Sequence, residues 1–349
     1  MNQAISQQLK TASLILPKKI TQESIVHLIH TSSPVEPSDF KAFRVVLGKL
    51  KKSFPKIKLF DVKKSKLDPR YLAASEKERL RKFRQARKKV DWLAPIYGGT
   101  GCIDIVRQLD NTDLAKIRKN RPVVNGFSDT TFLLLFLYFK LKLLTFHYSN
   151  VCGLSSAGQY RFWLKLISGR IDRFSFADKH AQWLSNRPTN NLEGIALGGN
   201  LSALRDLLDI SNIKVKSWKP FILFVEDVGI DAEDLHHIVA ALDEKGVFFH
   251  IRALVIGKIA DKEIIKNYQK FNFIFRGNKK PVREKPEKIF PYLLGRVLVQ
   301  RQKQKNPLPI LKIENLGHGI KKDTMILPIG SKVIIYPGGK IEFVGPFVR

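Results

Sequence analysis

A serine at a sharp turn is the first candidate for chemistry in this sequence. The apolar run 123–124 leads through Asn125 to Gly126, Ser128 stands two residues later, and a long apolar segment begins shortly after it. This order predicts a turn between a buried strand and a helix, at which the hydroxyl is exposed. The first amides of such a helix and its positive dipole end favour negative charge beside that hydroxyl. Ser128 is therefore a candidate nucleophile.

Two later segments could supply the partners that a serine nucleophile needs. Glu226 ends the apolar run 221–225, and His318 stands between Gly317 and Gly319. A serine, a carboxylate and a histidine, each expected at a turn, indicate acyl-transfer chemistry. Each feature alone is weak, because Ser-Asp is also a helix-capping pair, a glutamate often follows a strand, and a histidine between glycines is often only a turn residue.

A glycine loop is a further candidate for anion binding. The loop 97–102, Tyr-Gly-Gly-Thr-Gly-Cys, follows an apolar run at 90–96 and precedes apolar residues at helical spacing. Strand, glycine loop and helix form a geometry in which backbone amides can approach an oxyanion or a phosphate. The loop lacks the complete dinucleotide-binding and Walker patterns, so a plain tight turn is the alternative interpretation.

The elements that must position these residues alternate between strands and helices. The apolar spacing predicts helices between four strands, which we place at 25–29, 57–60, 90–96 and 123–125. Such alternation predicts a parallel α/β sheet with helices on both faces. Ligands of such sheets bind at the carboxyl ends of the strands, where the glycine loop and the Ser128 turn both fall.

The length of 349 residues predicts about two domains. We expect an N-terminal α/β domain over 1–165 that carries the nucleophile, a linker or lid over 166–190, and a C-terminal domain over 191–349 that carries Glu226 and His318. In that last part the pattern predicts further strands at 221–225 and 253–256, a helix over 234–245 and short strands after residue 310. The basic stretch 266–290 is expected to be a surface loop that leads into a helix.

The charge balance is unusual, because 61 lysines and arginines stand against 31 aspartates and glutamates, a formal net charge of +30. Such a surplus can attract nucleic acid or another anionic polymer. The basic residues are spread along the chain, and there is no zinc-finger spacing and no aromatic RNA-binding signature. We therefore expect no specific nucleic-acid function.

The two cysteines, Cys102 and Cys152, provide neither a disulfide framework nor a metal-ligand cluster. Cys102 lies beside the glycine loop, but no histidine or asparagine pattern supports it as a nucleophile, and we interpret it as a small helix residue. The most apolar run, 132–139, is shorter than the ~20 residues that span a bilayer and predicts a buried helix instead. With no secretory signal recognised in 1–16, we expect a cytoplasmic protein without a membrane span.

Together these segments resemble the LD-carboxypeptidase family of serine peptidases, which includes muramoyl-tetrapeptide carboxypeptidases and microcin C immunity peptidases. The resemblance runs in order along roughly residues 28–335. It rests on segments at 30–34, 71–75 with Arg79, 98–101, 126–129, 145–147, 198–201, 225–229, 317–319 and 327–330. No single segment is a strong motif, but their joint order and spacing are specific.

The resemblance implies a flavodoxin-like N-terminal domain and a C-terminal mixed α+β domain rich in β-structure, with the active site where they meet. It implies Ser128 as nucleophile, His318 as general base and acid, and Glu226 as the group that orients the imidazole. The backbone N–H groups of Gly99 and Asp129 are implied as the oxyanion hole. The family implies a homodimer and neither a metal nor another cofactor.

The resemblance also implies a reaction, which is release of terminal D-alanine from a murein tetrapeptide by cleavage of an L,D-peptide bond during peptidoglycan recycling. Five positions near the expected substrate pocket depart from the family pattern. Tyr148 and Ser149 stand where Gly-Pro is common, and Ile230 stands where a glutamate is common. In the glycine loop, Tyr97 and Thr100 replace the usual residues. Substrate identity is therefore the open question.

Three alternatives stay open. The chain could cleave an amide in a peptide–nucleotide antibiotic of the microcin C type, with Trp163 or Trp183 stacking on the base, although packing is the simpler role for both. It could instead be a non-catalytic protein that binds an anionic polymer. The chain order serine, glutamate, histidine also occurs in α/β-hydrolases, but these usually have a glycine where this chain has Thr130.

Overall fold

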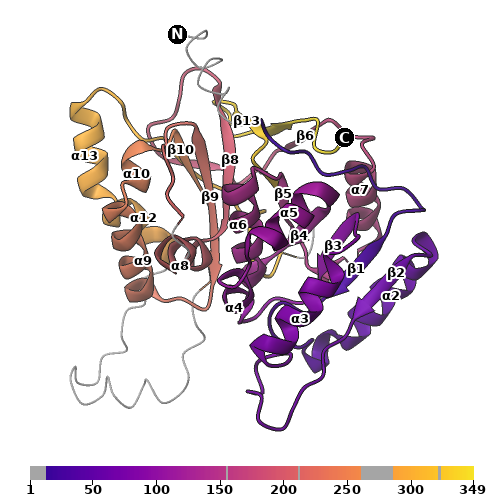
Figure 1. Cartoon of the computed structure of the whole chain (residues 1–349). Coiled ribbons are helices and arrows are strands. Elements are labelled where there is room, and N and C mark those ends of the chain that lie inside the picture. Colours follow the sequence, from indigo (N-terminus) through magenta and orange to yellow (C-terminus); the bar gives the residue numbers. More distant parts are fainter. Residues whose placement is uncertain (1–12, 155, 211–212, 261–285, 321–323) are drawn as a thin grey trace.

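Two β-sheets form the framework of the molecule, and Figure 1 shows them next to each other with helices around them. The structure is a computed structural model that describes residues 13–154, 156–210, 213–260, 286–320 and 324–349. The first sheet has the strand order β12-β5-β4-β3-β1-β2 and the second has the order β6-β14-β13-β8-β9-β10-β11-β7. This is the mixed α/β architecture that the sequence predicts.

The first sheet is parallel except at one edge. Its parallel strands are β1 (Val26–Ile29), β2 (Ile57–Phe60), β3 (Trp92–Pro95), β4 (Val123–Gly126) and β5 (Thr145–His147). The helices of this half are α2 (Phe40–Ser53), α3 (Glu76–Ala86), α4 (Cys102–Val106), α5 (Asn111–Asn120), α6 (Thr131–Leu141) and α7 (Ala157–Ile167). Every residue of β1, β3 and β4 is buried, as expected for parallel strands that are covered on both faces. The four predicted strands are confirmed.

Helix α6 joins the two halves of the chain. Nine of its eleven residues are buried, and a helix that is apolar on all sides must lie inside the protein. It contacts β4 and β5 of the first sheet, and it also contacts β8 (Leu192–Asn200) and α8 (Leu201–Ile210) of the second half. The buried helix expected from the run 132–139 is confirmed. No helix in the described part of the chain is long and apolar enough to cross a membrane.

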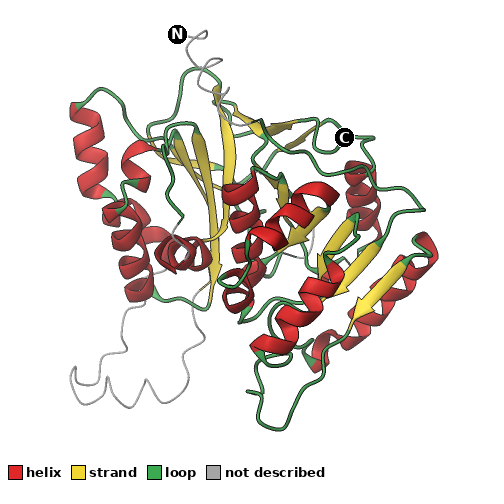
Figure 2. Cartoon of the chain, viewed as in Figure 1, coloured by secondary structure: helices red, strands yellow, loops and turns green. Residues whose placement is uncertain are grey.

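The second sheet has a parallel centre and antiparallel flanks. Its centre consists of β8, β9 (Phe221–Val228), β10 (Ala253–Ala260) and β11 (Ile310–Lys312). Its flanks are β6 (Arg173–Phe176), β7 (Gln182–Ser185), β13 (Lys332–Ile335) and β14 (Ile341–Val344). Figure 2 shows the helices beside this sheet, which besides α8 are α9 (Ala232–Glu244), α10 (Val247–His250), α12 (Pro286–Leu293) and α13 (Gly295–Lys303). Of the stretch 266–290, residues 266–285 lie outside the described residues.

The stretch 166–190, expected as a linker, contains two strands. Strand β6 pairs with β14 and β7 pairs with β11, so these two strands form the two edges of the second sheet. Edge strands are short and half exposed, which gives them the polar and aromatic composition that also suits a linker. The chain crosses back as well, because β12 (Leu327–Ile329) pairs with β5 of the first sheet. The expected domain boundaries stay a prediction.

Candidate active site

The Ser128 turn has the form that the sequence predicts. Strand β4 ends at Gly126, and Ser128 begins a short 3-10 helix, Ser128–Thr130, that leads directly into α6. The φ angle of Ser128 is +61°, in the left-handed region that side chains other than glycine rarely adopt. Such a conformation costs on the order of 1–3 kcal/mol and persists only when neighbouring contacts hold it.

Two side chains hold this turn. The Phe127 N–H donates to Thr130 Oγ1 at 2.6 Å and also to Asn150 Oδ1 at 3.1 Å. The Asn150 Nδ2 group in turn donates to the Phe127 carbonyl at 3.1 Å. A Cβ atom at Gly126 would lie 2.3 Å from Thr130 Oγ1, so the strand must end in glycine. These contacts explain why a threonine stands at position 130, where α/β-hydrolases usually have glycine.

The glycine loop lies against the serine. A Cβ atom at Gly98 would be 3.2 Å from the Ser128 Cβ, and one at Gly99 would be 2.1 Å from Ser33 Oγ. Ser33 fastens the loop from the other side, since its N–H donates to the Gly98 carbonyl at 3.0 Å and its Oγ accepts from the Thr100 N–H at 3.0 Å. Backbone rather than side chains therefore borders Ser128 on this side, as binding of an oxyanion by amides requires.

Asp129 ties the serine turn to the helix that follows the glycine loop. Its carboxylate accepts from the Cys102 N–H at 2.8 Å, which caps α4. Burial raises the pKa of Asp129 to about 6. The Asp129 N–H lies in the first helical turn, where amides have no partner within the helix. Burial also raises the pKa of the Cys102 thiol, so this cysteine is packed in the core and is not an activated nucleophile.

A buried arginine holds the glycine loop in place through hydrogen bonds to backbone carbonyls. Arg79, on α3, is fully buried and donates from Nη1 to the carbonyls of Thr31 and Gly101, each at 2.6 Å. Its Nη2 forms an ion pair with Asp104 at 2.8 Å. Three segments on which the family resemblance rests, 30–34, 71–75 with the following arginine, and 98–101, thus meet at one side chain. Their shared role is to shape the loop beside Ser128.

Glu226 and His318 form a hydrogen-bonded pair. Glu226 is near the end of β9 with no exposed surface, and its Oε2 lies 2.6 Å from Nδ1 of His318, in the loop between β11 and β12. Burial by itself would raise the pKa of Glu226, but the imidazoles of His318 and His147 outweigh it and bring that pKa to about 2. The ring of Phe127, the neighbour of Ser128 in the chain, lies 4.5 Å from the His318 ring. The segments that carry Ser128, Glu226 and His318 therefore lie next to one another.

A second histidine reaches the same carboxylate, and the sequence analysis missed it as a site residue. His147 ends β5, which runs parallel to β4 with His147 opposite Gly126. Its Nε2 lies 3.6 Å from Glu226 Oε1. The available signal was its place in the segment 145–147, at the end of the strand next to the nucleophile strand.

Lys258 is another residue that the sequence analysis did not single out. It follows Gly257 on β10, its N–H donates to the Leu316 carbonyl at 2.7 Å, and its side chain is exposed. A Cβ atom at Gly319 would be 3.2 Å from Lys258 Nζ. The ammonium group of Lys258 therefore lies beside the loop that carries His318. In a chain with 61 lysines and arginines, nothing in the sequence sets this one apart.

The two tryptophans considered for base stacking are packing residues. Trp163 is fully buried, and its ring lies 5.1 Å from that of Phe146 and 5.5 Å from that of Tyr148. Trp183 donates from Nε1 to the Pro337 carbonyl at 2.9 Å within the second sheet. Tyr148, one of the departures from the family pattern, is thus part of the core.

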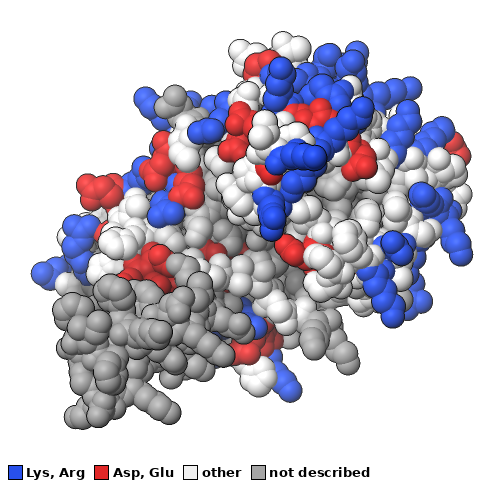
Figure 3. All heavy atoms as spheres, turned by 90° about the horizontal axis from the view of Figure 1, so that it is seen from below, with Lys and Arg blue, Asp and Glu red and all other residues white. Residues whose placement is uncertain are grey.

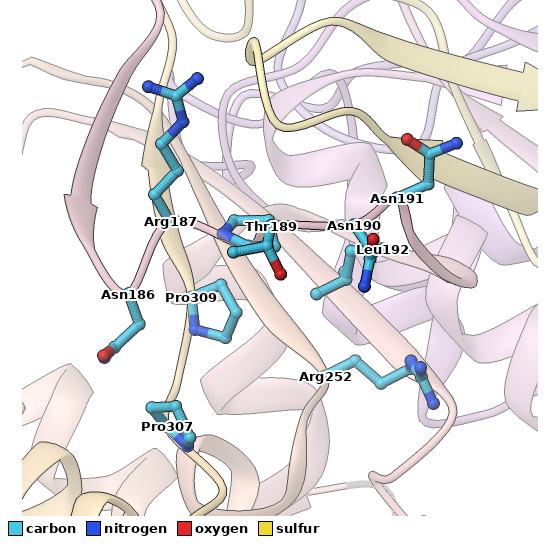
Figure 4. A pocket seen from close by; sticks show the side chains of 10 residues that line it. Asn186, Arg187, Thr189, Asn190, Asn191, Leu192, Arg252, Pro307 and Pro309 are labelled. Atoms are coloured by element: carbon cyan, nitrogen blue, oxygen red, sulfur yellow. The ribbon is translucent and has the colours of Figure 1, made fainter. Parts of the chain in front are cut away.

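A separate hollow of about 410 Å³ is lined by residues 186–192 with Arg252, Pro307 and Pro309 (Figure 4). Arg252 and Pro309 directly precede β10 and β11, whereas Glu226 stands near the end of the parallel strand β9. The hollow therefore lies at the amino ends of the parallel strands, whereas Glu226 lies near their carboxyl ends. Figure 4 shows the guanidinium groups of Arg187 and Arg252 pointing in different directions, so they do not form a joint anion site.

The basic surplus is not gathered into one tract on the face shown in Figure 3. Lys and Arg side chains are scattered over the described surface there, with acidic side chains between them. A nucleic-acid groove requires clustered positive charge, and this face does not present it. The described residues also contain no group of three or more His, Cys, Asp or Glu side chains arranged to hold a metal ion.

Two domain models match the sequence. A model of the LD-carboxypeptidase N-terminal domain matches residues 26–148, and a model of the LD-carboxypeptidase C-terminal domain matches residues 193–335. The two matches cover most of the chain and contain Ser128, Glu226 and His318. No curated protein matches the sequence.

Solved structures share the fold at low sequence identity. The microcin C7 self-immunity protein MccF, solved in complex with aspartyl sulfamoyl adenosine, is 18% identical with a TM-score of 0.71 over 96% of this chain and 100% of its own. Muramoyltetrapeptide carboxypeptidase from Oxalobacter formigenes is 21% identical with a TM-score of 0.65 over 93% of this chain and 99% of its own. An MccF-like protein from Bacillus anthracis is 16% identical with a TM-score of 0.68, covering 95% and 99% of the two chains.

Proposed function

Because this chain belongs to the LD-carboxypeptidase family, we propose that it is a serine carboxypeptidase that releases terminal D-alanine from murein tetrapeptides. The observation that carries this proposal is the hydrogen bond of 2.6 Å between His318 Nδ1 and Glu226 Oε2, in contact with the Ser128 turn through Phe127. A buried carboxylate on one imidazole nitrogen leaves the other nitrogen to act on a serine hydroxyl.

In the proposed reaction, Ser128 Oγ attacks the carbonyl carbon of the L,D-peptide bond while His318 Nε2 takes the hydroxyl proton. Glu226 orients the imidazole and stabilises it once it is charged. The backbone N–H groups of Gly99 and Asp129 bind the oxyanion of the tetrahedral intermediate. His318 then gives its proton to the leaving D-alanine amine, and water, activated by the same imidazole, hydrolyses the acyl-enzyme. The proposed steps use no metal and no cofactor.

The substrate side of the proposal rests on charge. A murein tetrapeptide carries several carboxylates, and the ammonium group of Lys258 lies along the loop that bears His318. In the described part of the chain, no Asp or Glu forms an ion pair with Lys258, and the residue is exposed. We propose that Lys258 binds a substrate carboxylate and thereby helps to place the scissile bond.

Replacing Lys258 with methionine keeps the side-chain length and removes the charge. We expect the KM for the tetrapeptide to rise about tenfold and kcat to change less than about threefold, because binding is weakened while the reacting groups stay in place. Steady-state kinetics at low ionic strength measures both constants. The control is Lys332→Met, which removes an exposed lysine that pairs with Glu193 at 2.9 Å. An unchanged KM in Lys258→Met would show that another group binds the carboxylate.

The direct test is incubation of the wild-type protein with L-Ala-γ-D-Glu-meso-diaminopimelyl-D-Ala and mass measurement of the products. The expected products are the tripeptide and free D-alanine. The alternative substrate class is suggested by the ligand of the MccF complex, which is aspartyl sulfamoyl adenosine. An aminoacyl sulfamoyl adenosine is therefore the second substrate in the same assay. Cleavage of that compound alone would replace the murein proposal with the immunity-type reaction.

A non-catalytic role would give another result. If neither substrate is cleaved and the protein binds an anionic polymer in a salt-dependent way that survives Ser128→Ala, the protein is a polyanion-binding member of the family. We further propose that the enzyme acts in the cytoplasm as a homodimer in peptidoglycan recycling. Cell fractionation and light scattering of the purified protein test the first two statements, and accumulation of tetrapeptides in a deletion strain tests the third.

A further inference from the structure

The carboxylate of Glu226 lies between two imidazoles. Its Oε2 is 2.6 Å from Nδ1 of His318, and its Oε1 is 3.6 Å from Nε2 of His147. Glu226 and His147 are both fully buried, whereas the His318 side chain keeps 22% of its surface exposed. In the described structure, Glu226 Oε1 and both ring nitrogens of His147 have no hydrogen-bond partner. A fully buried carboxylate oxygen without a donor is costly, and His147 Nε2, 3.6 Å away, is a candidate donor.

The surroundings hold His147 in this position. Gly199, at the end of β8, has a φ of +129°, and a Cβ atom there would lie 2.7 Å from His147 Cδ2 and 3.1 Å from Nε2. Phe127 also packs against His147, with its ring centroid 4.9 Å from that of the imidazole. The space in front of His147 is therefore made by a glycine that could carry no side chain without displacing the ring from Glu226.

The titratable groups around the Glu226 carboxylate come from β9, from β5 and from the His318 loop. Glu226 and Asp227 are adjacent on β9, and Asp227 is satisfied by Asn200 Nδ2 at 2.8 Å and by Ser202 Oγ at 2.6 Å. Asn200 is uncharged, as are Gly199 and Phe127, which contact His147. Among the described residues, His318 and His147 are thus the groups that lie close enough to Glu226 to donate a hydrogen bond or to present positive charge to it.

We propose that His147 is a positioning residue that donates a hydrogen bond from Nε2–H to Glu226 Oε1 and so holds the carboxylate, as an anion, in the orientation that His318 needs. The inference rests on the proposed function, because it concerns how the Ser128, His318 and Glu226 set is kept ready. With both oxygens bonded, the carboxylate cannot rotate away from His318. If Oε1 has no donor, Glu226 is protonated more easily. A protonated Glu226 no longer holds His318 in the orientation that the reaction needs.

The first measurement uses the wild-type protein and needs no activity. Nitrogen-15 NMR of the histidine side chains reports whether His147 Nε2 carries a proton and whether that proton is coupled to a hydrogen bond. The proposal requires a protonated Nε2. A bare Nε2, with the proton on Nδ1 alone, overturns it.

The second measurement compares two variants. His147→Phe keeps a ring of similar size without a donor, and His147→Gln places an amide N–H near the position of Nε2. Carbon-13 NMR of the Glu226 carboxyl should show an ionised group down to about pH 4 in the wild type, as a pKa of about 2 requires. In His147→Phe the pKa should rise by about one unit or more, so that the carboxyl titrates between about pH 3 and pH 5. His147→Gln should behave as the wild type does, and equal titration of all three proteins overturns the proposal.

Reaction with a fluorophosphonate, which labels activated serines whatever the natural substrate, connects this to reactivity. We expect labelling of Ser128 to slow by about tenfold to a hundredfold in His147→Phe and to recover to within a few-fold in His147→Gln. A purely structural role would give equal losses in both variants. Labelling and NMR do not depend on the murein assay, so failure of the tetrapeptide to react would contradict the proposed substrate and leave this inference standing.

Discussion

Ser128→Ala is expected to lower kcat for the tetrapeptide by at least about 10⁴-fold, with little change in the melting temperature. Loss of the nucleophile from a serine triad removes nearly all catalysis by the set, because the other members have nothing to activate. The turn should survive, since Thr130 and Asn150 hold it through the backbone of Phe127 and not through the serine hydroxyl. Alanine has a Cβ atom as serine does, so the φ of +61° at this position brings no new steric conflict in the variant.

The measurement is release of D-alanine under single-turnover and steady-state conditions, with thermal unfolding as the check on folding. Ser168→Ala is the matched control, because Ser168 is a partly exposed serine directly after α7 whose Oγ donates to the Lys165 carbonyl at 3.1 Å. The control should retain full activity. If Ser128→Ala kept more than about a tenth of wild-type activity, Ser128 could not be the nucleophile.

Glu226→Gln is expected to lower kcat by about 10³- to 10⁴-fold with the fold intact. Glutamine has the shape of glutamate, so the space between the two histidines stays filled. It has no negative charge to stabilise the imidazolium of His318, and its amide group can present N–H where His318 needs an acceptor. Histidine then adopts the wrong tautomer for removing the proton of Ser128. The control is Glu193→Gln, an exposed glutamate on β8 that pairs with Lys332.

The same variant should change how stability depends on pH. The pKa of Glu226 is about 2 in the folded protein against 4.5 for the free side chain, so its ionised form stabilises the fold above pH 4.5. That contribution is lost as the pH falls from 4.5 towards 2. Urea unfolding at about pH 3 and about pH 6 should therefore show that the wild type gains more stability than Glu226→Gln between the two values, on the order of 2 kcal/mol. Equal pH dependence in the two proteins would contradict the low pKa.

Local patterns in the sequence predicted the elements that short-range physics controls. The order of an apolar run, a glycine and a serine predicted the Ser128 turn, since only a backbone bend connects a buried strand to a helix within so few residues. Ser75, with Glu78 three residues later, has the local pattern that starts a helix, and the Glu78 N–H donates to Ser75 Oγ at 3.3 Å at the start of α3. The apolar run 132–139 predicted a buried helix, because a helix that is apolar on all sides must lie inside the protein.

Edge strands and strand crossings escaped prediction because their partners are far away in the sequence. Strands β6 and β7 exist only because β14 and β11 lie beside them, more than a hundred residues further along the chain. Strand β12 belongs to the first sheet although its sequence neighbours belong to the second. Short, half-exposed segments have no strong period of their own, so pairing rather than pattern determines their structure.

The sequence alone determined the chemical types and their order, which are a serine in a turn, a glutamate ending a strand and a histidine between glycines. It also determined the family, through segments spread along roughly residues 28–335. Only the tertiary structure decided that a second imidazole, that of His147, faces Glu226, that Asn150 holds the nucleophile turn, and that Lys258 lies along the His318 loop. These contacts join strands β5, β9 and β10 with the loops around them, and a side chain's neighbours across a sheet depend on strand order and register, which no local pattern encodes.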